Sequence, residues 1–422
     1  MTKNIDILPD IKPQTPISVF KRDDFFSVEE IFSIEKVAAL VGMSEGFCKK
    51  VCGRKRFLNA ADVLDLLDQD AFSETFVPRS KILDYLLKTV QEENFYEEPP
   101  LKVVPEKHQL YRANAKDLIK KLPLNSIQCV VTSTPYWGMR IYKEASAVQW
   151  ADGEYCPFGH EQTPEGFIRH TIEILYLLKA LLKEKGSIWW NIMDTFNTRT
   201  QIRGNAAEAL AAMKGNDKRS WSEHDCRRYS AGHSYLKDGE QCHIPTAIAQ
   251  RAARIGFYVK SLITWSKVST TPEPQNSRVS RSLEYIIHLS KHRTPTFSKD
   301  IYRSLPSTMG GRNNGWETDK LSDVWTLQTS SGRDGHGAQF PVSLPARCIA
   351  LTTTENDFVL DPFVGSGNSG VAARALDRSF IGVDISQEYL DIAERKISMA
   401  EKVQFEDLTK QISESPNLEM PL

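Results

Sequence analysis

Two short segments of this chain combine residue types that can do chemistry. The first, 133–136 (STPY), follows the apolar run 126–131, which is typical of a buried strand. The second, 361–370 (DPFVGSGNSG), contains three glycines that match G-x-G-x-x-G between an expected strand and an expected helix. Open α/β sheets bind their ligands at the carboxyl ends of the strands, so both segments lie where a site would form.

The glycine loop predicts a nucleotide-cofactor site, because glycine lets the backbone approach a ligand closely. Asp361 stands directly before the loop, where a carboxylate would repel a pyrophosphate. The same carboxylate would attract the ammonium and sulfonium charges of S-adenosylmethionine. Asp384 closes the next expected strand, 19 positions after Gly365, and can accept hydrogen bonds from ribose hydroxyls. The charges therefore favour S-adenosylmethionine over NAD.

The segment 133–136 suits methylation of an exocyclic amino nitrogen on a nucleobase. That nitrogen is a poor nucleophile, because its lone pair is delocalised into the ring. The Ser133 hydroxyl and the Thr134 carbonyl can accept its two hydrogens, and Pro135 would hold Thr134 extended so that the carbonyl is aimed. Tyr136 offers a flat face to a base removed from the duplex. The alternative is an ordinary strand followed by a proline turn.

Together the two segments resemble the DNA amino-methyltransferases of the beta arrangement, in which the catalytic motif precedes the cofactor motif. Residues 133–136 are similar to the family's Ser-Pro-Pro-Tyr, and residues 361–367 match its Asp-Pro-Phe-x-Gly-Ser-Gly. Residues 380–384 match the ribose-binding strand of the family, and residues 339–341 resemble the segment that wraps the methionine end of the cofactor. Residues 265–267, 284–285 and 323–325 also resemble segments of this family. The resemblance covers about residues 108–400.

The resemblance implies a site-specific enzyme of a restriction-modification system that methylates a flipped base in duplex DNA, without a covalent intermediate. Ser133 favours cytosine N4, since the adenine-N6 enzymes mostly carry Asp or Asn at that position. Thr134 departs from the family's first proline, which weakens this assignment. The expected cofactor contacts are Phe340, Pro341, Asp361, Pro362, Phe363, Gly365, Ser366, Gly367 and Asp384. Adenine-N6 methylation, an NAD-dependent oxidoreductase and a non-catalytic DNA-binding regulator remain alternatives.

The elements that must position these segments alternate between strand and helix over residues 107–400. This alternation predicts an α/β fold with a Rossmann-like, mostly parallel sheet and helices on both faces. Strands are expected at 126–131, 187–192, 258–265, 283–290, 358–360 and 380–383, and helices at 167–185, 245–255, 370–376 and 388–399. Gly186 is expected to stop the helix 167–185. The polar segments 199–240 and 292–334 are expected to be irregular target-recognition inserts.

Residues 1–91 predict a small N-terminal helical unit that begins with a loose arm of 20 residues. Ser44 is expected to cap a helix that continues to Val51, and a strand-like stretch at 56–58 precedes a second helix at 59–67. The pattern resembles a winged helix-turn-helix, although a purely structural helical cap fits it equally well. A linker at 92–106 follows, and an acidic tail is expected at 401–422.

Charge is balanced overall but not locally. The 422 residues carry 53 Lys and Arg against 54 Asp and Glu, so global charge does not indicate a polyanionic partner. Between residues 251 and 303, however, ten basic residues face three acidic ones. Such a stretch predicts a surface that contacts DNA phosphates, with Arg278 and Arg281 as candidates, and a solvated surface is the alternative.

The seven cysteines are spread along the chain and lack paired C-x-x-C spacing. A zinc site built on Cys156, His160, Cys226, Cys242 and His243 is therefore not expected, and no metal is predicted. The chain has no run of eighteen apolar residues and no apolar leader at its start, so we expect a cytoplasmic protein without a membrane span.

Overall fold

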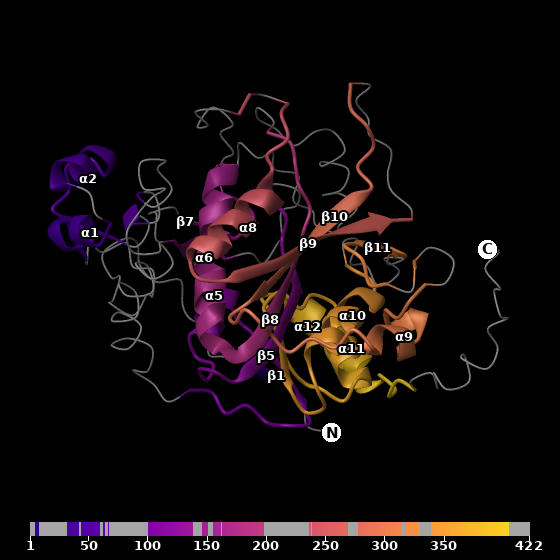
Figure 1. Ribbon diagram of the computed structural model, residues 1–422. Coiled ribbons are helices and arrows are strands. Elements are labelled where there is room, and N and C mark those ends of the chain that lie inside the picture. The colour runs from indigo at the N-terminus through magenta and orange to yellow at the C-terminus, as the bar shows by residue number, and fades with distance from the viewer. Residues whose placement is uncertain are drawn as a thin grey trace.

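The computed structural model describes residues 5–7, 32–41, 44–59, 62–63, 66, 100–137, 146–150, 155–161, 163–197, 236–237, 239–268, 277–313, 317–318, 320–329 and 339–404. The centre of this part is a nine-stranded sheet of order β1-β4-β13-β12-β5-β8-β10-β9-β11 (Figure 1). The bounds are β1 Ile5–Ile7, β4 His108–Arg112, β5 Ile127–Ser133, β8 Leu182–Ile192, β9 Tyr258–Lys267, β10 Leu283–Ser290, β11 Val324–Leu327, β12 Phe358–Asp361 and β13 Ser379–Asp384.

Parallel pairing dominates this sheet. Within the described part of this sheet, only β10 runs antiparallel to its neighbours β8 and β9, and every other neighbouring pair is parallel. The prediction of a mostly parallel sheet is therefore confirmed. The first residues were expected to form a loose arm, but Ile5–Ile7 pair with β4 and form one edge of the sheet.

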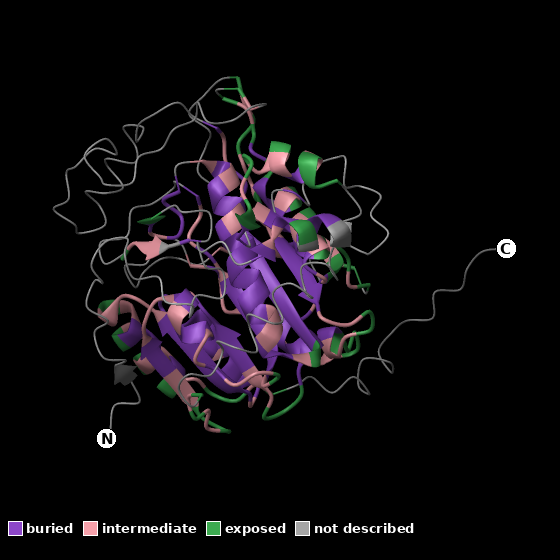
Figure 2. Ribbon diagram, turned by 90° about the vertical axis from the view of Figure 1, so that its left-hand side faces the viewer, coloured by how far each residue is buried: buried purple, intermediate pink, exposed green. Residues whose placement is uncertain are grey.

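Helices cover both faces of the sheet, which explains why the central strands are apolar on both sides. One face carries α5 (Ala115–Ile119), α6 (Pro164–Leu181) and α8 (Ile244–Arg254), and the other carries α10 (Ser343–Thr352), α11 (Asn368–Ala375) and α12 (Gln387–Ser398) (Figure 1). The adjacent residues Trp189 and Trp190 of β8 belong to the two different cores. Figure 2 shows the buried residues concentrated in the sheet and in the helices packed on it.

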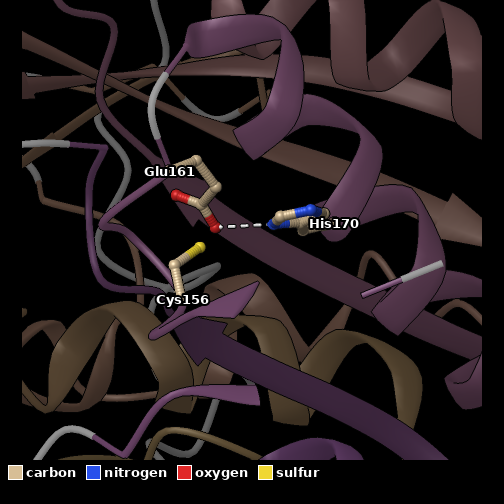
Figure 3. Close-up of side chains that lie close together, drawn as sticks. All are labelled: Cys156, Glu161 and His170. Carbon is tan, nitrogen blue, oxygen red and sulfur yellow. Dashed lines mark hydrogen bonds and ion pairs between the residues drawn. The ribbon is translucent and has the colours of Figure 1, made fainter. Parts of the chain in front are cut away.

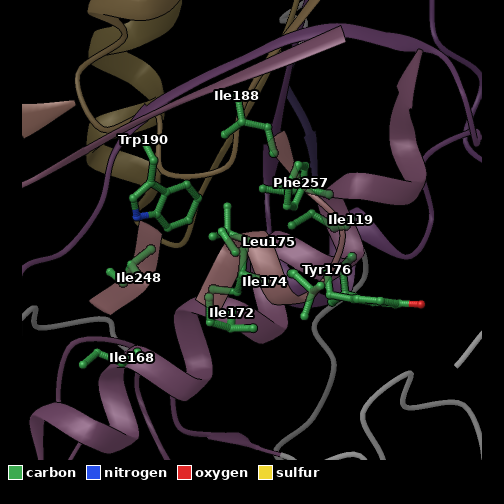
Figure 4. Packing of buried hydrophobic residues seen from close by; sticks show 14 of the residues in the cluster. Ile119, Ile168, Ile172, Ile174, Leu175, Tyr176, Ile188, Trp190, Ile248 and Phe257 are labelled. Atoms are coloured by element: carbon green, nitrogen blue, oxygen red, sulfur yellow. The ribbon is translucent and has the colours of Figure 1, made fainter. Parts of the chain in front are cut away.

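The helix α6 is the main covering element on its face. Thr163 caps it by accepting a hydrogen bond from the Gly166 amide at 3.0 Å, and Pro164 occupies the first turn. Its apolar side packs against Ile188 and Trp190 of the sheet (Figure 4). Its apolar character thus serves packing in the core. No helix in the described part of the chain is both long and apolar enough to cross a lipid bilayer.

The end of α6 differs from the prediction. The helix ends at Leu181 instead of Lys185, and Gly186 lies inside β8. A Cβ atom at Gly186 would lie 3.0 Å from the carbonyl oxygen of Lys183 and 3.1 Å from that of Gln128. The glycine therefore allows two backbone segments to approach closely where the register between β5 and β8 shifts, and it does not stop a helix.

The segment 292–334 is also more regular than predicted. Its described part contains α9 (Ile301–Ser304), the 3-10 turn η4 (Ser307–Met309) and the edge strand β11. Trp325 of β11 is buried in the core, and so is Tyr302 of α9. Much of this segment therefore belongs to the sheet and its core. The other expected insert, 199–240, lies almost entirely outside the described residues.

The N-terminal unit contains α1 (Ile34–Val41), α2 (Glu45–Val51) and an antiparallel pair of β2 (Phe32–Ser33) with β3 (Phe57–Leu58). The Ser44 hydroxyl accepts a hydrogen bond from the Phe47 amide at 3.2 Å, which confirms the predicted cap. Of the helix expected at 59–67, the structure describes helical residues at 62, 63 and 66. A DNA-binding role for this unit stays a prediction.

Candidate active site

The glycine loop connects β12 to α11. Gly365 and Gly367 have φ angles of 51° and 89°, in the left-handed region that favours glycine. A Cβ atom at Gly367 would lie 2.7 Å from the Cβ atom of Ala393 in α12, so any other residue would push the loop away from that helix. The loop therefore has the bare, tightly turned backbone that was predicted to hold a nucleotide cofactor.

Asp361 ends β12 and is 1 % exposed. Its Oδ1 accepts hydrogen bonds from the Thr132 hydroxyl at 2.6 Å and the Phe363 amide at 3.0 Å, and its Oδ2 accepts one from the Ser369 hydroxyl at 2.5 Å. Burial raises the pKa of this carboxyl to about 6, although these hydrogen bonds oppose the shift. Asp361 thus fixes the shape of the loop, and its attraction for the cofactor's positive charges stays a prediction.

Asp384 ends β13 and supports the same loop from the neighbouring strand. Its Oδ2 accepts a hydrogen bond from the Gly365 amide at 2.9 Å, and its Oδ1 accepts one from the Ser386 amide at 2.9 Å. The side chain is half-buried, and a carboxylate has about four acceptor positions. Asp384 therefore supports the loop, and its hydrogen bonds to ribose hydroxyls stay a prediction.

The segment 339–341, which precedes the glycine loop in the chain, contacts that loop. The Ser366 hydroxyl is hydrogen-bonded to Oε1 of Gln339, and the Asn368 amide nitrogen donates to the carbonyl oxygen of Phe340 at 2.7 Å. The segment predicted to wrap part of the cofactor therefore lies against the loop that was predicted to bind it. The contacts of Pro341, Pro362 and Phe363 with the cofactor stay predictions.

The tetrad 133–136 begins on the last residue of β5. Ser133 is the register partner of Asn191 on β8, and the Asn191 amide nitrogen lies 3.1 Å from the Ser133 hydroxyl. The Ser133 hydroxyl is also 3.3 Å from the hydroxyl of Tyr136. Ser133, Pro135 and Tyr136 are partly exposed, whereas Thr134 is buried. The two side chains predicted to meet the base, Ser133 and Tyr136, thus lie together at the carboxyl end of β5.

A network of polar side chains anchors the tetrad. We name it the Tyr136 cluster, and its members are Ser133, Tyr136, Asn191, Lys267 and Glu284. The Tyr136 hydroxyl donates to Oε2 of Glu284 at 2.5 Å, and the Asn191 amide nitrogen donates to the same oxygen at 2.7 Å. The Lys267 ammonium lies 2.6 Å from Oε1 of Glu284. Glu284 is only 6 % exposed, so its charge is compensated by a cation and by two hydrogen-bond donors.

Asn191 was missed in the sequence, and Lys267 and Glu284 were noticed only through the family resemblance. Glu284 interrupts the apolar run of β10, and Asn191 interrupts that of β8. A polar residue within a buried strand is the only local sign of such a role. Trp137, next to the tetrad, is fully buried, and its indole nitrogen donates to the carbonyl oxygen of Glu161 at 2.9 Å. Its role is therefore packing within the core next to the tetrad.

The tetrad and the glycine loop are direct neighbours, because β5 and β12 are paired in parallel. The hydrogen bond between Thr132 and Asp361 joins the residue before the tetrad to the residue before the loop. A base held at Ser133 and Tyr136 would therefore lie beside a cofactor held at 361–367. This arrangement suits direct transfer of a small group between two ligands.

Arg278 and Arg281 lie in the connection between β9 and β10. Their guanidinium carbons are 4.0 and 5.2 Å from the ring centroid of Phe196, and Arg281 also donates to the carbonyl oxygen of Asp194 at 3.1 Å. Both arginines are half-buried. They precede β10, whose second residue is Glu284 of the Tyr136 cluster. Their contact with DNA stays a prediction.

Two cations of the basic stretch 251–303 are paired with carboxylates. Arg251 pairs with Glu165 at 2.5 Å, and Lys267 is bound to Glu284 in the Tyr136 cluster. The described part of the stretch is distributed over α8, β9, β10 and α9. The remaining contacts of this stretch with DNA stay a prediction.

Comparisons with known proteins identify the family of this chain. A family model described as DNA methylase, of the N6/N4 type, matches residues 127–395. The type II methyltransferase M.Cfr9I from Citrobacter freundii is 29 % identical over 293 residues, which cover 68 % of this chain and 87 % of that protein. M.SmaI from Serratia marcescens, also a type II methyltransferase, is 26 % identical over 293 residues, or 67 % of this chain and 88 % of that protein. The solved cytosine-N4-specific PvuII DNA methyltransferase covers 72 % of this chain and 94 % of its own, with 17 % identity and a TM-score of 0.48.

Proposed function

Because this chain belongs to the N6/N4 family of DNA methylases, we propose that it methylates the exocyclic N4 of a cytosine flipped out of duplex DNA at a specific site. The chain is a DNA methyltransferase, and S-adenosylmethionine is its methyl donor. The choice of cytosine N4 rests on one observation, the serine hydroxyl at position 133, in place of a carboxylate or an amide, within the Tyr136 cluster.

The residues present fit the cofactor. The left-handed glycines at 365 and 367 leave bare backbone between β12 and α11, and polar groups of Gln339 and Ser366 meet at the same loop. The half-buried carboxylate of Asp384 would accept the ribose hydroxyls at the edge of β13. When bound, S-adenosylmethionine supplies an electrophilic methyl group on a positively charged sulfur.

The tetrad would make the amino nitrogen a better nucleophile by accepting its hydrogens. The Ser133 hydroxyl and the carbonyl oxygen of Thr134 are the two acceptors, and Pro135 keeps Thr134 extended. The Tyr136 ring would stack on the flipped base, which contributes about 1–3 kcal/mol of binding. Glu284 and Asn191 would hold the tyrosine hydroxyl, so that the ring is already oriented before the base arrives.

Methylation at cytosine C5 is disfavoured, since that reaction requires a cysteine thiolate as the nucleophile. Cys129 is the cysteine on β5, and burial raises the pKa of its thiol to about 12. The described cysteines are buried, apart from the half-buried Cys52 of the N-terminal unit. Direct transfer to an amino nitrogen needs no such nucleophile, which agrees with the composition of the tetrad.

The experiment that tests this proposal is nucleoside analysis of a plasmid from cells expressing the chain, with a Ser133→Ala strain as the control. We expect N4-methyldeoxycytidine from the native chain and a strong decrease in the variant. N6-methyldeoxyadenosine as the product would contradict the assignment of the base and leave the methyltransferase activity intact. A DNA without any added methyl group would contradict the whole proposal.

We further infer that the enzyme protects its site from a cognate restriction endonuclease, as the type II names of its relatives suggest. The substrate would be double-stranded DNA, and no physical contact with the endonuclease is implied. The target-recognition role of 199–240 and 292–334 belongs to this proposal. Sequencing of the methylated plasmid should locate the modified site, and cleavage assays with endonucleases of that specificity should then show protection.

A further inference from the structure

A second group of reactive side chains lies in the core near the tetrad. Cys156 ends the short strand β7 (Tyr155–Cys156), Glu161 lies in the loop after it, and His170 lies on α6 (Figure 3). Their exposed fractions are 1 %, 0 % and 1 %. The sulfur, one carboxylate oxygen and one ring nitrogen all lie within 4.8 Å of one another. This is the one group of potential metal ligands found in the described part of the chain.

The carboxylate of Glu161 is incompletely satisfied. Its Oε1 accepts a hydrogen bond from the Gly159 amide at 3.1 Å and lies 3.1 Å from Nδ1 of His170. Its Oε2 is buried and has no hydrogen-bond partner among the described residues. A buried acceptor without a donor is destabilising, and more so when it is charged. A cation at this point would remove that cost.

We propose that Cys156, Glu161 and His170 bind a zinc ion. A thiolate, a carboxylate and a neutral imidazole carry two negative charges, which balance one Zn²⁺ in the core. Thiolate and imidazole ligands favour zinc over magnesium or calcium, which prefer oxygen. Three ligands from the protein leave one tetrahedral position for a further donor.

The distances fit a metal-free form of such a site. Tetrahedral zinc with bonds of about 2.0–2.3 Å holds its ligand atoms about 3.3–3.7 Å apart. The 3.1 Å between Nδ1 of His170 and Oε1 of Glu161 is slightly shorter than this spacing, so the two atoms would move apart by a few tenths of an ångström on binding the metal. The widest pair in the group, at up to 4.8 Å, would have to approach by about 1 Å, which a rotation of the Cys156 side chain can supply.

Aromatic neighbours hold the ligands in place. The Trp150 ring stacks on His170 with centroids 4.1 Å apart, and its indole nitrogen donates to the carbonyl oxygen of Cys156 at 2.9 Å. The indole of Trp137 donates to the carbonyl oxygen of Glu161 at 2.9 Å. Hydrogen bonds and stacking contacts of this kind, made to the residues that bind a metal, hold the ligands in the orientation that the metal requires.

The loop that carries two of the ligands also touches both halves of the active site. Phe158 stacks on Phe363 of the cofactor loop with centroids 5.3 Å apart. A Cβ atom at Gly159 would lie 3.2 Å from the Cβ atom of Pro135 in the tetrad. The zinc ion would therefore stabilise the loop 155–161, which contacts the tetrad and the cofactor loop, and would take no part in methyl transfer.

In the sequence, Cys156 was weighed as a ligand only with other partners, no metal was predicted, and neither Glu161 nor His170 was singled out. Cys156 and His170 are 14 positions apart, Glu161 lies between them, and none of the three belongs to a C-x-x-C or H-x-x-x-H pair. Only the position of α6 beside the loop 155–161 brings the imidazole to the thiol. The inference is independent of which base the enzyme methylates.

The test is the metal content of the full-length protein, purified without chelator and dialysed, measured by plasma mass spectrometry. We expect about one zinc ion per chain. Cys156→Ser and His170→Gln should each lose most of it. Cys348→Ser should keep it, because Cys348 is an equally buried thiol on the other face of the sheet. A native protein without zinc that also fails to bind added zinc would contradict the proposal, and so would Cys156→Ser with the zinc content of Cys348→Ser.

A second measurement covers the case in which the Cys156 and His170 variants do not fold. Cobalt added to the native chain after removal of zinc should produce the near-ultraviolet charge-transfer absorption of a thiolate-bound Co²⁺. Removal of the metal by a chelator should also lower the midpoint of thermal unfolding, and added zinc should restore it. Absence of the cobalt–thiolate band would overturn the assignment of Cys156.

Discussion

The hydroxyl group of Tyr136 donates a hydrogen bond of 2.5 Å to Oε2 of Glu284, a residue 148 positions further along the chain. The bond joins the carboxyl end of β5 to the beginning of β10, on either side of β8. It fixes the tyrosine ring at its hydroxyl end, while the backbone of the tetrad fixes it at the Cα end. An aromatic ring held at both ends is oriented before it receives a base.

This relationship predicts distinct effects of two substitutions at Tyr136. Tyr136→Ala removes the stacking face and should lower kcat by about 10–100-fold, in line with about 1–3 kcal/mol per stacked base. The affinity for S-adenosylmethionine should change far less, because the ring serves the base. Tyr136→Phe keeps the ring and should have a smaller effect. Equal loss of cofactor affinity and turnover in Tyr136→Ala would assign the ring to the cofactor site.

Glu284→Gln should lower kcat by about 10-fold, since a hydrogen bond to a charged group contributes about 1.5–3 kcal/mol. The variant should become insensitive to Tyr136→Phe, because both changes remove the same contact. Glu394→Gln is a matched control, since Glu394 pairs with His108 away from the tetrad. Full additivity of Glu284→Gln and Tyr136→Phe in steady-state kinetics would argue against the positioning role.

Asp384→Ala should weaken the binding of S-adenosylmethionine by about 10–100-fold and leave the fold intact. The carboxylate supports Gly365 and is predicted to accept the ribose hydroxyls, so each lost hydrogen bond to the charged group contributes about 1.5–3 kcal/mol. Asp391→Asn on the exposed side of α12 is the control. Calorimetric titration measures the affinity, and an unchanged value in a well-folded Asp384→Ala protein would refute the ribose assignment.

The affinity for S-adenosylmethionine should depend on pH through Asp361, because burial raises the pKa of this carboxyl to about 6. Below that pH the carboxyl is neutral and cannot attract a cation, whereas above it the carboxylate can. The dissociation constant should therefore fall by about tenfold as pH rises from 5 to 7, which corresponds to about 1.4 kcal/mol of partly screened attraction. Asp361→Asn should flatten the profile in calorimetry at several pH values. A native profile as flat as that of the variant would show that the carboxylate serves only the loop.

Replacing Arg278 and Arg281 together by glutamine should weaken DNA binding on all sequences and flatten its salt dependence by about one unit of slope per lost phosphate contact. Discrimination between cognate and scrambled duplexes should survive, because phosphate contacts position a protein without reading bases. Arg395→Gln with Lys402→Gln is the control, which removes one charge from the last turn of α12 and one from the segment after it. Collapse of discrimination with an unchanged slope would mean that the arginines read base edges. An unchanged affinity would mean that they only pack on Phe196.

The two motifs were recognisable in the sequence because their chemistry is local. Pro135 restricts the residue before it, and Gly365 and Gly367 adopt φ angles that other residues avoid. The conformation of both loops can therefore be predicted from a few consecutive residues. The alternation of strands and helices likewise predicted a mostly parallel sheet, because the apolar pattern of each strand is contained within it. The predicted starts and ends of the elements were less accurate. The role of Gly186, for example, depends on a close backbone contact with another strand, which the local sequence does not show.

Tertiary structure alone decided which side chains surround those loops. Asn191, Lys267 and Glu284 come from three different strands, and only the register of β8, β9 and β10 places them around Tyr136. Cys156, Glu161 and His170 meet only because α6 packs beside the loop 155–161. Backbone conformation depends on neighbouring residues, whereas the pairing of buried polar groups depends on contacts between distant segments. The sequence by itself therefore determined the motifs and the class of fold, and the packing of the strands and helices determined the network that supports them.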